Sequence, residues 1–292
     1  MTDAVPTNIE MYNRICGGNG LHEGDRMALA YWNNLISFSK VKKLLESNFE
    51  GRIKNNFHGC FWEIYLPKAF DINGICLRRG GKGSPDFCFE KNGKKIYLEA
   101  VACGEPEEIN IVPPPVLDGD FEHGIAPEVE IMQRLANAVS VKIAKFNKAY
   151  SQIIKCSNDF YIIALNGFRA INNYPHDSVF KPPFVVKTLF GMGNYKRFYE
   201  AGKCVDDGFE CIERTIKNAP VAHFTKPENK KIAGLLYSKT SVWSCNLPEG
   251  KDFVFIQNPY ATDVTDIFDF CKEGRWIRRS LEQGRWRIEN AS

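Results

Sequence analysis

The sequence predicts an α/β fold in which helices flank a mixed β-sheet, with a helical N-terminal part and a β-rich C-terminal extension. Three observations support this prediction. Apolar residues recur at helical spacing before residue 70, three short strand-like runs follow between residues 75 and 103, and a long helical segment then leads to a buried strand. Such an order combines antiparallel neighbours with a helical crossover, so we expect mixed strand directions.

The N-terminal segment, residues 1–56, is expected to be helical. Within residues 22–50, four apolar side chains recur at helical spacing: Leu35, Phe38, Val41 and Leu45. A second helix is expected over residues 57–70, where Pro67 could end it early. This second helix begins a central part, residues 57–170, and residues 171–292 form the β-rich extension packed on it.

A three-strand meander follows the second helix. We expect strands at residues 75–79, 86–90 and 95–103, and the pair Asn92-Gly93 between the last two is a strong hairpin signal. Further along the chain we expect a long loop, a long helix and a buried strand, at residues 103–127, 127–156 and 160–165. The extension should hold four strands and a short helix, at residues 184–189, 219–224, 232–237, 253–256 and 264–271.

Composition excludes several classes of protein. Apolar residues make up 44% of the 292 residues and charged residues 25%, which is ordinary for a globular protein. No apolar run approaches the roughly 18 residues that span a bilayer, and the first residues lack the pattern of a signal peptide. The ten cysteines include no CxxC pair, so a zinc ribbon is not expected. We therefore expect a soluble cytoplasmic protein, and a homodimer is compatible with the sequence.

Two acidic residues belong to neighbouring strands of the expected hairpin. Asp86 begins one strand and Glu99 lies in the middle of the next, so the Asn92-Gly93 turn should bring their carboxylates side by side. Adjacent carboxylates repel each other unless a cation neutralises them, and hard oxygen ligands suit Mg²⁺ or Mn²⁺. Glu99 is also surrounded by apolar neighbours in the sequence, which indicates a partner or a metal, although an exposed strand face is the alternative.

These residues carry a family resemblance. The string Ser84-Pro85-Asp86, the hairpin, and Tyr97-Leu98-Glu99-Ala100-Val101 together resemble the signature of the PD-(D/E)xK, or restriction-endonuclease-like, nuclease superfamily. The preceding helix carries Glu63, which matches an acidic position of that family. The resemblance covers about residues 57–167 and implies a restriction-endonuclease-like core. It also implies that Glu63, Asp86 and Glu99 are catalytic residues that bind Mg²⁺ or Mn²⁺.

One position departs from the family pattern, because Val101 occupies the place of the motif lysine. Either the chain is an inactive nuclease, or a lysine from elsewhere in the chain takes the place of the motif lysine. Lys142 lies on the apolar stripe of the long helix, where a carboxylate beneath the helix would give it a partner; otherwise its side chain extends to solvent. We expect Lys142 to be the catalytic replacement. Arg134 and Lys145, at the edge of that stripe, are expected to contact phosphate or substrate.

Other basic residues are candidates for nucleic-acid binding. Lys82 lies in the glycine-rich turn Gly80-Gly81-Lys82-Gly83, and Arg278 and Arg285 belong to a C-terminal segment that alternates arginine with tryptophan. That segment could equally dock its tryptophans on the core. The sequence thus predicts a metal-dependent endonuclease acting on DNA, with RNA left open. The alternative is an inactive nuclease fold that binds nucleic acid or protein.

Overall fold

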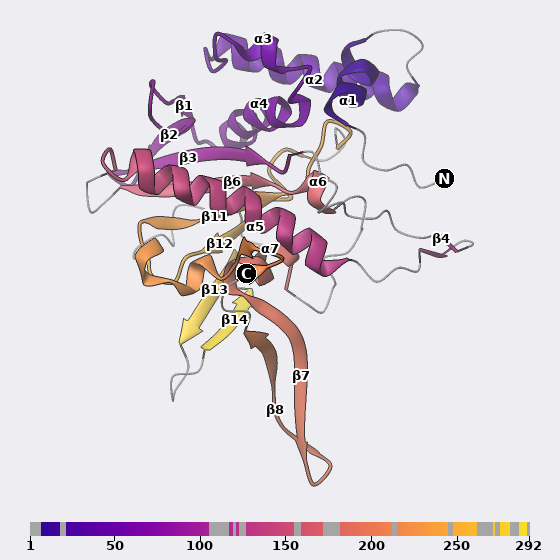
Figure 1. Cartoon of the computed structure of the whole chain (residues 1–292). Coiled ribbons are helices and arrows are strands. Elements are labelled where there is room, and N and C mark those ends of the chain that lie inside the picture. Colours follow the sequence, from indigo (N-terminus) through magenta and orange to yellow (C-terminus); the bar gives the residue numbers. More distant parts are fainter. Residues whose placement is uncertain are drawn as a thin grey trace.

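The computed structural model describes residues 7–17, 22–104, 117–118, 121–122, 127–154, 159–171, 182–211, 215–244, 248–261, 271, 275–280 and 286–290. Its centre is a mixed eight-stranded sheet in the order β1-β2-β3-β6-β11-β12-β13-β14 (Figure 1). The strands span Arg78–Arg79, Phe87–Lys91, Lys94–Ala102, Phe160–Asn166, Ile232–Ser238, Val254–Gln257, Arg275–Ser280 and Trp286–Asn290. The predicted α/β class with mixed strand directions is therefore confirmed.

The sheet combines parallel pairs (β3–β6, β6–β11 and β12–β13) with antiparallel pairs (β1–β2, β2–β3, β11–β12 and β13–β14). Strand β6 lies between β3 and β11 and is parallel to both, whereas β1, β2 and β3 form an antiparallel meander. Every residue of β6 and β11 is buried, as expected for parallel strands covered on both faces. Strands β11–β14, which follow residue 171, thus extend the same sheet that the meander begins.

Helices cover both faces of the sheet (Figure 1). One face packs against α1, α2 and α4, whose apolar side chains form one core cluster with Leu98, Ala100 and Ala164. The other face packs against α5 and α7, and Tyr97, Tyr161 and Ile163 join that second cluster. The helices span Asn8–Cys16 (α1), Glu23–Val41 (α2), Phe49–Arg52 (α3), Phe57–Ile72 (α4), Glu128–Lys145 (α5), Phe168–Ile171 (α6) and Phe184–Phe190 (α7).

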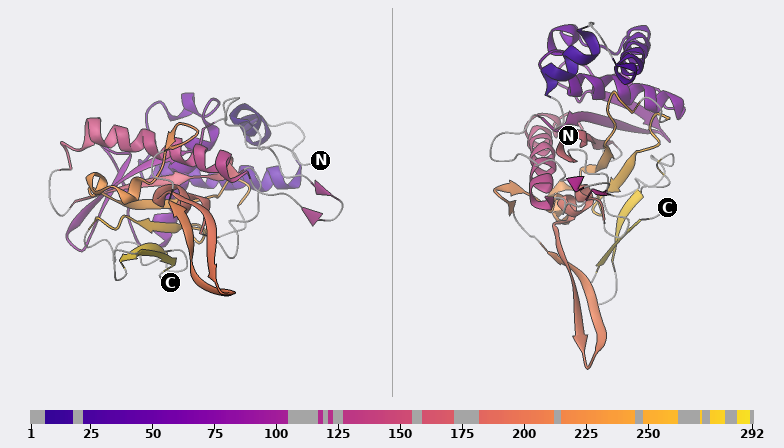
Figure 2. Two further views of the ribbon diagram at one scale, coloured as in Figure 1. Left: turned by 60° about the horizontal axis from the view of Figure 1, so that its bottom comes forward. Right: turned by 90° about the vertical axis from the view of Figure 1, so that its right-hand side faces the viewer.

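The remaining strands form small hairpins. The pair β7 (Met192–Glu200) and β8 (Lys203–Cys211) projects away from the body of the protein, on the side opposite the N-terminal helices (Figures 1 and 2). Shorter pairs are β4 (Leu117–Asp118) with β5 (Phe121–Glu122), and β9 (Thr215–Ile216) with β10 (Ala219–Pro220). Within the described ranges, no helix has both the length and the apolar character needed to cross a membrane.

Several boundaries differ from the predicted ones. Helix α4 continues through Pro67 to Ile72, because burial on nearly all sides compensates for one missing backbone hydrogen bond. The helix predicted at residues 22–50 ends at Val41 and is followed by the separate short helix α3. Helix α5 ends at Lys145 and is continued by a π-helical turn, Phe146–Tyr150, rather than running to residue 156.

The strand predicted at residues 184–189 is wrong, because this segment forms helix α7. All seven residues of α7 are buried, so the apolar run had no period to reveal its type. The helix begins after Pro183 and ends at Gly191, whose φ of 63° closes it, and both residues are typical helix-boundary signals. At residues 219–224 only β10 is a strand, and a 3₁₀ turn, His223–Thr225, follows.

The other predicted strands of the extension, at residues 232–237 and 253–256, are confirmed as β11 and β12. Most of the predicted loop at residues 103–127 and nearly all of the helix at residues 264–271 lie outside the described residues.

Glycine-to-alanine substitutions should have opposite effects on stability in the crowded sheet and on the open helix surface. A Cβ atom at Gly234 in β11 would lie 2.5 Å from the Phe255 ring and 2.7 Å from the Ile256 carbonyl oxygen, whereas nothing lies within 4 Å of a Cβ at Gly24 in α2. We predict that Gly234→Ala lowers the free energy of unfolding by about 1–3 kcal/mol. Gly24→Ala should raise it by up to about 1 kcal/mol. Urea denaturation measures both, and an equal loss in the two variants would contradict the packing described.

Candidate functional site

The β2–β3 hairpin places two carboxylates at one level of the sheet. Phe87 pairs with Leu98 across the hairpin, so Asp86, the residue before β2, is opposite Glu99. The turn at Asn92 and Gly93 has φ angles of 52° and 71°, as the asparagine-glycine pair predicted. Asp86 Oδ2 also accepts a hydrogen bond of 2.8 Å from the Ala100 backbone N–H of β3. The predicted neighbourhood of these two acidic residues is confirmed.

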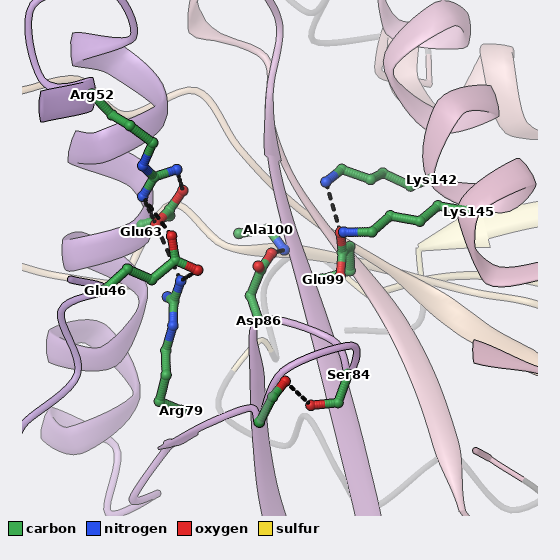
Figure 3. Close-up of polar contacts among 11 residues, drawn as sticks. Glu46, Arg52, Glu63, Arg79, Ser84, Asp86, Glu99, Ala100, Lys142 and Lys145 are labelled. Carbon is green, nitrogen blue, oxygen red and sulfur yellow. Dashed lines mark hydrogen bonds and ion pairs between the residues drawn. The ribbon is translucent and has the colours of Figure 1, made fainter. Parts of the chain in front are cut away.

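Glu99 is completely buried and faces helix α5. Its Oε1 atom accepts hydrogen bonds from Lys142 Nζ at 2.8 Å and from Lys145 Nζ at 2.6 Å (Figure 3). The two lysines lie three residues apart on α5 and therefore project from the same side of the helix. Glu99 Oε2 is also buried, and no described residue gives it a hydrogen bond of ordinary geometry. Among the described residues, one oxygen of this carboxylate thus accepts two hydrogen bonds and the other accepts none.

The predicted partner of Lys142 is present, because the Glu99 carboxylate lies beneath the helix as expected. Lys145, predicted to contact phosphate, also engages Glu99 and lies over the Tyr150 ring at 5.2 Å. Burial lowers the pKa of Lys145. Its hydrogen bonds to Glu99 and Tyr150 raise that pKa by a larger amount, so the net shift is upward. Lys145 therefore remains a cation at the mouth of the site.

Asp86 differs from Glu99 because it forms no ion pair with any described residue. Burial raises the pKa of Asp86 to about 6, and the negative charge of Glu99 adds to this shift, while the Lys142 ammonium opposes it. A cation bound close to this carboxyl group would favour its ionised form and lower its pKa.

Glu63 lies in a separate ionic cluster. Both of its carboxylate oxygens accept hydrogen bonds from Arg52, at 2.9 and 2.7 Å, and Arg79 Nη2 is 3.5 Å from Oε2 (Figure 3). Glu46 pairs with both arginines, at 3.2 Å from Arg52 and in close contact with Arg79. Two arginines and two glutamates thus form one ionic cluster.

The structure does not bring Glu63, Asp86 and Glu99 together as a set of metal ligands. Among the residues it describes, no group of three or more histidine, cysteine or acidic side chains is arranged to hold a metal ion. The physical reason is competition. Arg52 already occupies both oxygens of Glu63, and two lysines occupy one oxygen of Glu99. Asp86 and Glu99 are neighbours, and Glu63 is not arranged as their third ligand.

Both ionic clusters border the same hollow. A pocket of about 300 Å³ is lined by Arg52 and Glu63 on one side, Asp86 in the middle, and Lys142 and Lys145 on the other. Figure 3 shows Asp86 between the arginine–glutamate cluster and the Glu99–lysine cluster.

A wider hollow of about 780 Å³ adjoins this pocket, and Asp86 and Lys145 line both. The wider hollow is bordered by the glycine-rich turn before β2, including the exposed Lys82. Gly80 is required in this turn, because a Cβ atom there would lie 1.8 Å from the Pro85 carbonyl oxygen.

Arg134, also predicted to contact phosphate or substrate, has a structural role. Arg134 is buried, and its guanidinium donates to the carbonyl oxygens of Arg169 and Gly104, both at 2.5 Å, so it is not available to a phosphate. The prediction for Arg134 is therefore corrected: its apolar surroundings on α5 mark a buried structural contact. Arg278 lies in β13 opposite Ile288, and Arg285 lies outside the described residues.

Sequence reasoning missed Arg52, Arg79 and Glu46. Arg52 ends the short helix α3 and Arg79 lies in the two-residue strand β1, so neither has a periodic relation to Glu63 on α4. Nothing in the local sequence could have shown that they meet. Comparisons of the chain with protein-family models, with curated proteins and with solved structures found no match.

We predict that Asp86→Asn raises the free energy of unfolding at pH 7 by on the order of 2 kcal/mol, measured with a chelator present. The folded protein holds the Asp86 proton more tightly than the unfolded chain, since its pKa rises from 3.8 to about 6. The stability that this group contributes is therefore present below about pH 4 and is lost as the pH rises through about 6. The asparagine can still accept the Ala100 hydrogen bond.

Urea denaturation between pH 4 and pH 8 measures this difference. The two proteins should be similar in stability at pH 4 and diverge towards pH 7. Glu90→Gln, on the exposed side of β2, is the matched control and should change stability by less than about 0.5 kcal/mol throughout. A constant difference at every pH would contradict a raised pKa at Asp86.

Proposed function

We propose that this protein is a divalent-metal-dependent nuclease that hydrolyses phosphodiester bonds of DNA. The observation that carries the proposal is the hollow lined by Asp86, Lys142 and Lys145, in which Asp86 lies beside Glu99 and forms no ion pair with a described residue. Acidic and basic groups at one small pocket suit a phosphate ester, because the substrate brings negative charge while the acids can hold a cation. The order of α4, meander, α5 and β6 supports a restriction-endonuclease-like core.

The donors at the pocket fit a hard divalent ion. Asp86 lines the pocket and has a raised pKa, and Glu99 lies buried beside it with one oxygen, Oε2, that has no hydrogen-bond partner among the described residues. Both are ligands of the kind that Mg²⁺ and Mn²⁺ prefer. When bound, such an ion would lower the pKa of a water molecule and stabilise charge on the phosphate. Asp86 and Glu99 are the residues that would hold it.

Lys142 would supply the ammonium group that the family pattern has at the position of Val101. Val101 lines the same pocket two residues after Glu99, and Lys142 Nζ reaches that region from helix α5. A lysine ammonium bound to Glu99 is kept oriented by that carboxylate and can donate a further hydrogen bond to a phosphate oxygen or to the attacking water. Lys145, more exposed at the pocket mouth, and Lys82 in the adjoining hollow would contact flanking phosphates.

One observation also favours the second reading, an inactive nucleic-acid-binding protein. Lys142 and Lys145 already neutralise Glu99, so the site is electrostatically stable without a metal ion. In that case the lysines would bind phosphate and no bond would be cleaved. The two readings differ in what a metal ion should do, and the following experiments separate them.

We predict that the wild type cleaves DNA only when Mg²⁺ or Mn²⁺ is present. Asp86→Asn and Glu99→Gln should lower the cleavage rate at least about 100-fold, and Lys142→Met by about 10²–10³-fold, since each removes a group that acts on the developing charge. Plasmid and single-stranded DNA and RNA, incubated with metal or with chelator, measure this. Lys148→Met, an exposed lysine on the following turn, is the control and should retain full activity. No cleavage of any substrate by the wild type would exclude the enzyme.

We predict that Mn²⁺ raises the melting temperature of the wild type but not that of Asp86→Asn. At a concentration tenfold above its Kd, a bound ion stabilises the folded state by about 1.4 kcal/mol. For a chain of this length that corresponds to a shift of a few degrees. Differential scanning fluorimetry measures the shift, with Glu90→Gln as the control. An equal response in Asp86→Asn would mean that the ion binds elsewhere.

A further inference from the structure

Arg52 of the arginine–glutamate cluster borders the same pocket as Asp86. Arg52 lines the pocket, and its terminal nitrogens Nη1 and Nη2 are held by both oxygens of Glu63. Its Nε atom is buried and has no hydrogen-bond partner among the described residues. An arginine has five N–H donors, so this guanidinium has donors beyond those that Glu63 and Glu46 use.

Glu63 is engaged in a way that suits support of an arginine better than binding of a metal ion. Both of its oxygens form one bidentate contact with Arg52, and Arg79 approaches the second oxygen. Binding a metal through Glu63 would require this contact to break and would leave Arg52 with a weaker partner. Bidentate arginine–carboxylate pairs are among the strong and geometrically specific contacts in proteins.

Arg52 has the chemistry of a phosphate ligand. The planar guanidinium matches the oxygens of a phosphate, and the Glu63 contact fixes its orientation in advance. The hydrogen bond to Glu63 also raises the pKa of Arg52, so the side chain keeps its charge. Figure 3 shows the Arg52 guanidinium on one side of Asp86 and the Lys142 ammonium on the other. A phosphate in this pocket would therefore meet cations from both sides.

We propose that Arg52 binds the substrate phosphate in this pocket and that Glu63 is its positioning residue rather than a metal ligand. This inference rests on the proposed function, because it identifies the group that recognises the phosphate at the same site. It replaces the expectation from the sequence that Glu63 coordinates the ion. Glu46 completes the arrangement by holding both arginines.

The test separates phosphate binding from metal binding in the full chain. Affinity for a short fluorescent DNA duplex is measured by anisotropy over a range of salt concentrations with a chelator present, and Mn²⁺ affinity is measured by calorimetry. Arg52→Met should weaken DNA binding about tenfold and reduce the slope of log affinity against log salt by about 0.9, as expected for one lost phosphate contact. Arg78→Met removes the exposed neighbour of Arg79 on β1 and should leave that slope unchanged.

Glu63→Gln should change Mn²⁺ affinity by less than about twofold, whereas Asp86→Asn should abolish Mn²⁺ binding. Arg52→Met leaves Glu63 without its partner, so the double variant Arg52→Met, Glu63→Gln serves as the folding control and should show the same salt slope as Arg52→Met. Circular dichroism confirms that each variant is folded.

Two results would overturn the inference. One is a loss of Mn²⁺ binding in Glu63→Gln as large as in Asp86→Asn, and the other is a salt slope in both Arg52 variants equal to that of Arg78→Met. A wild type that binds neither DNA nor Mn²⁺ would overturn this inference and the proposed nuclease together. A wild type that binds DNA through Arg52 but cleaves nothing would remove only the nuclease proposal.

Discussion

The buried carboxylate of Glu99 and the two lysines that reach it from helix α5 are the interaction on which the site depends. Glu99 lies in the middle of β3, with the sheet on both sides and a helix above it, so an isolated charge there would be strongly destabilising. Lys142 and Lys145 meet this requirement through a single oxygen. The contact therefore also fixes α5 against β3 and directs two ammonium groups towards the pocket.

The same contact explains why Asp86 is electrostatically distinct. The lysines are engaged with Glu99 on one side of the pocket, and the arginines on the other side are engaged with Glu46 and Glu63. Asp86 lies between these two clusters and forms no ion pair within the described part of the chain, and burial together with the charge of Glu99 raises its pKa. A divalent ion would relieve this imbalance, and the cations on either side would then receive the phosphate. Under the proposed function, Asp86 and Glu99 would hold the metal ion, and the arginine and lysine groups on either side would bind the phosphate.

Local chemistry predicted the parts of the site that depend on neighbouring residues. The asparagine-glycine turn set the register that brings Asp86 level with Glu99, and helical periodicity placed Lys142 above them. Local chemistry did not predict contacts between residues on separate elements whose sequence patterns are unrelated, such as Arg52 on α3 and Glu63 on α4. It also failed for helix α7, because a segment buried on all sides has no polar face to show its type.

The most direct test of the central claim is the pKa of Asp86 itself, measured by the carboxyl carbon chemical shift in a pH titration with and without Mg²⁺. We predict a pKa near 6 without the ion and a clear downward shift when Mg²⁺ is added, because a bound cation favours the ionised form. A pKa near the ordinary 3.8 that Mg²⁺ does not change would contradict this prediction. Asp86 would then be an ordinary surface carboxylate, and the pocket would hold no metal through it.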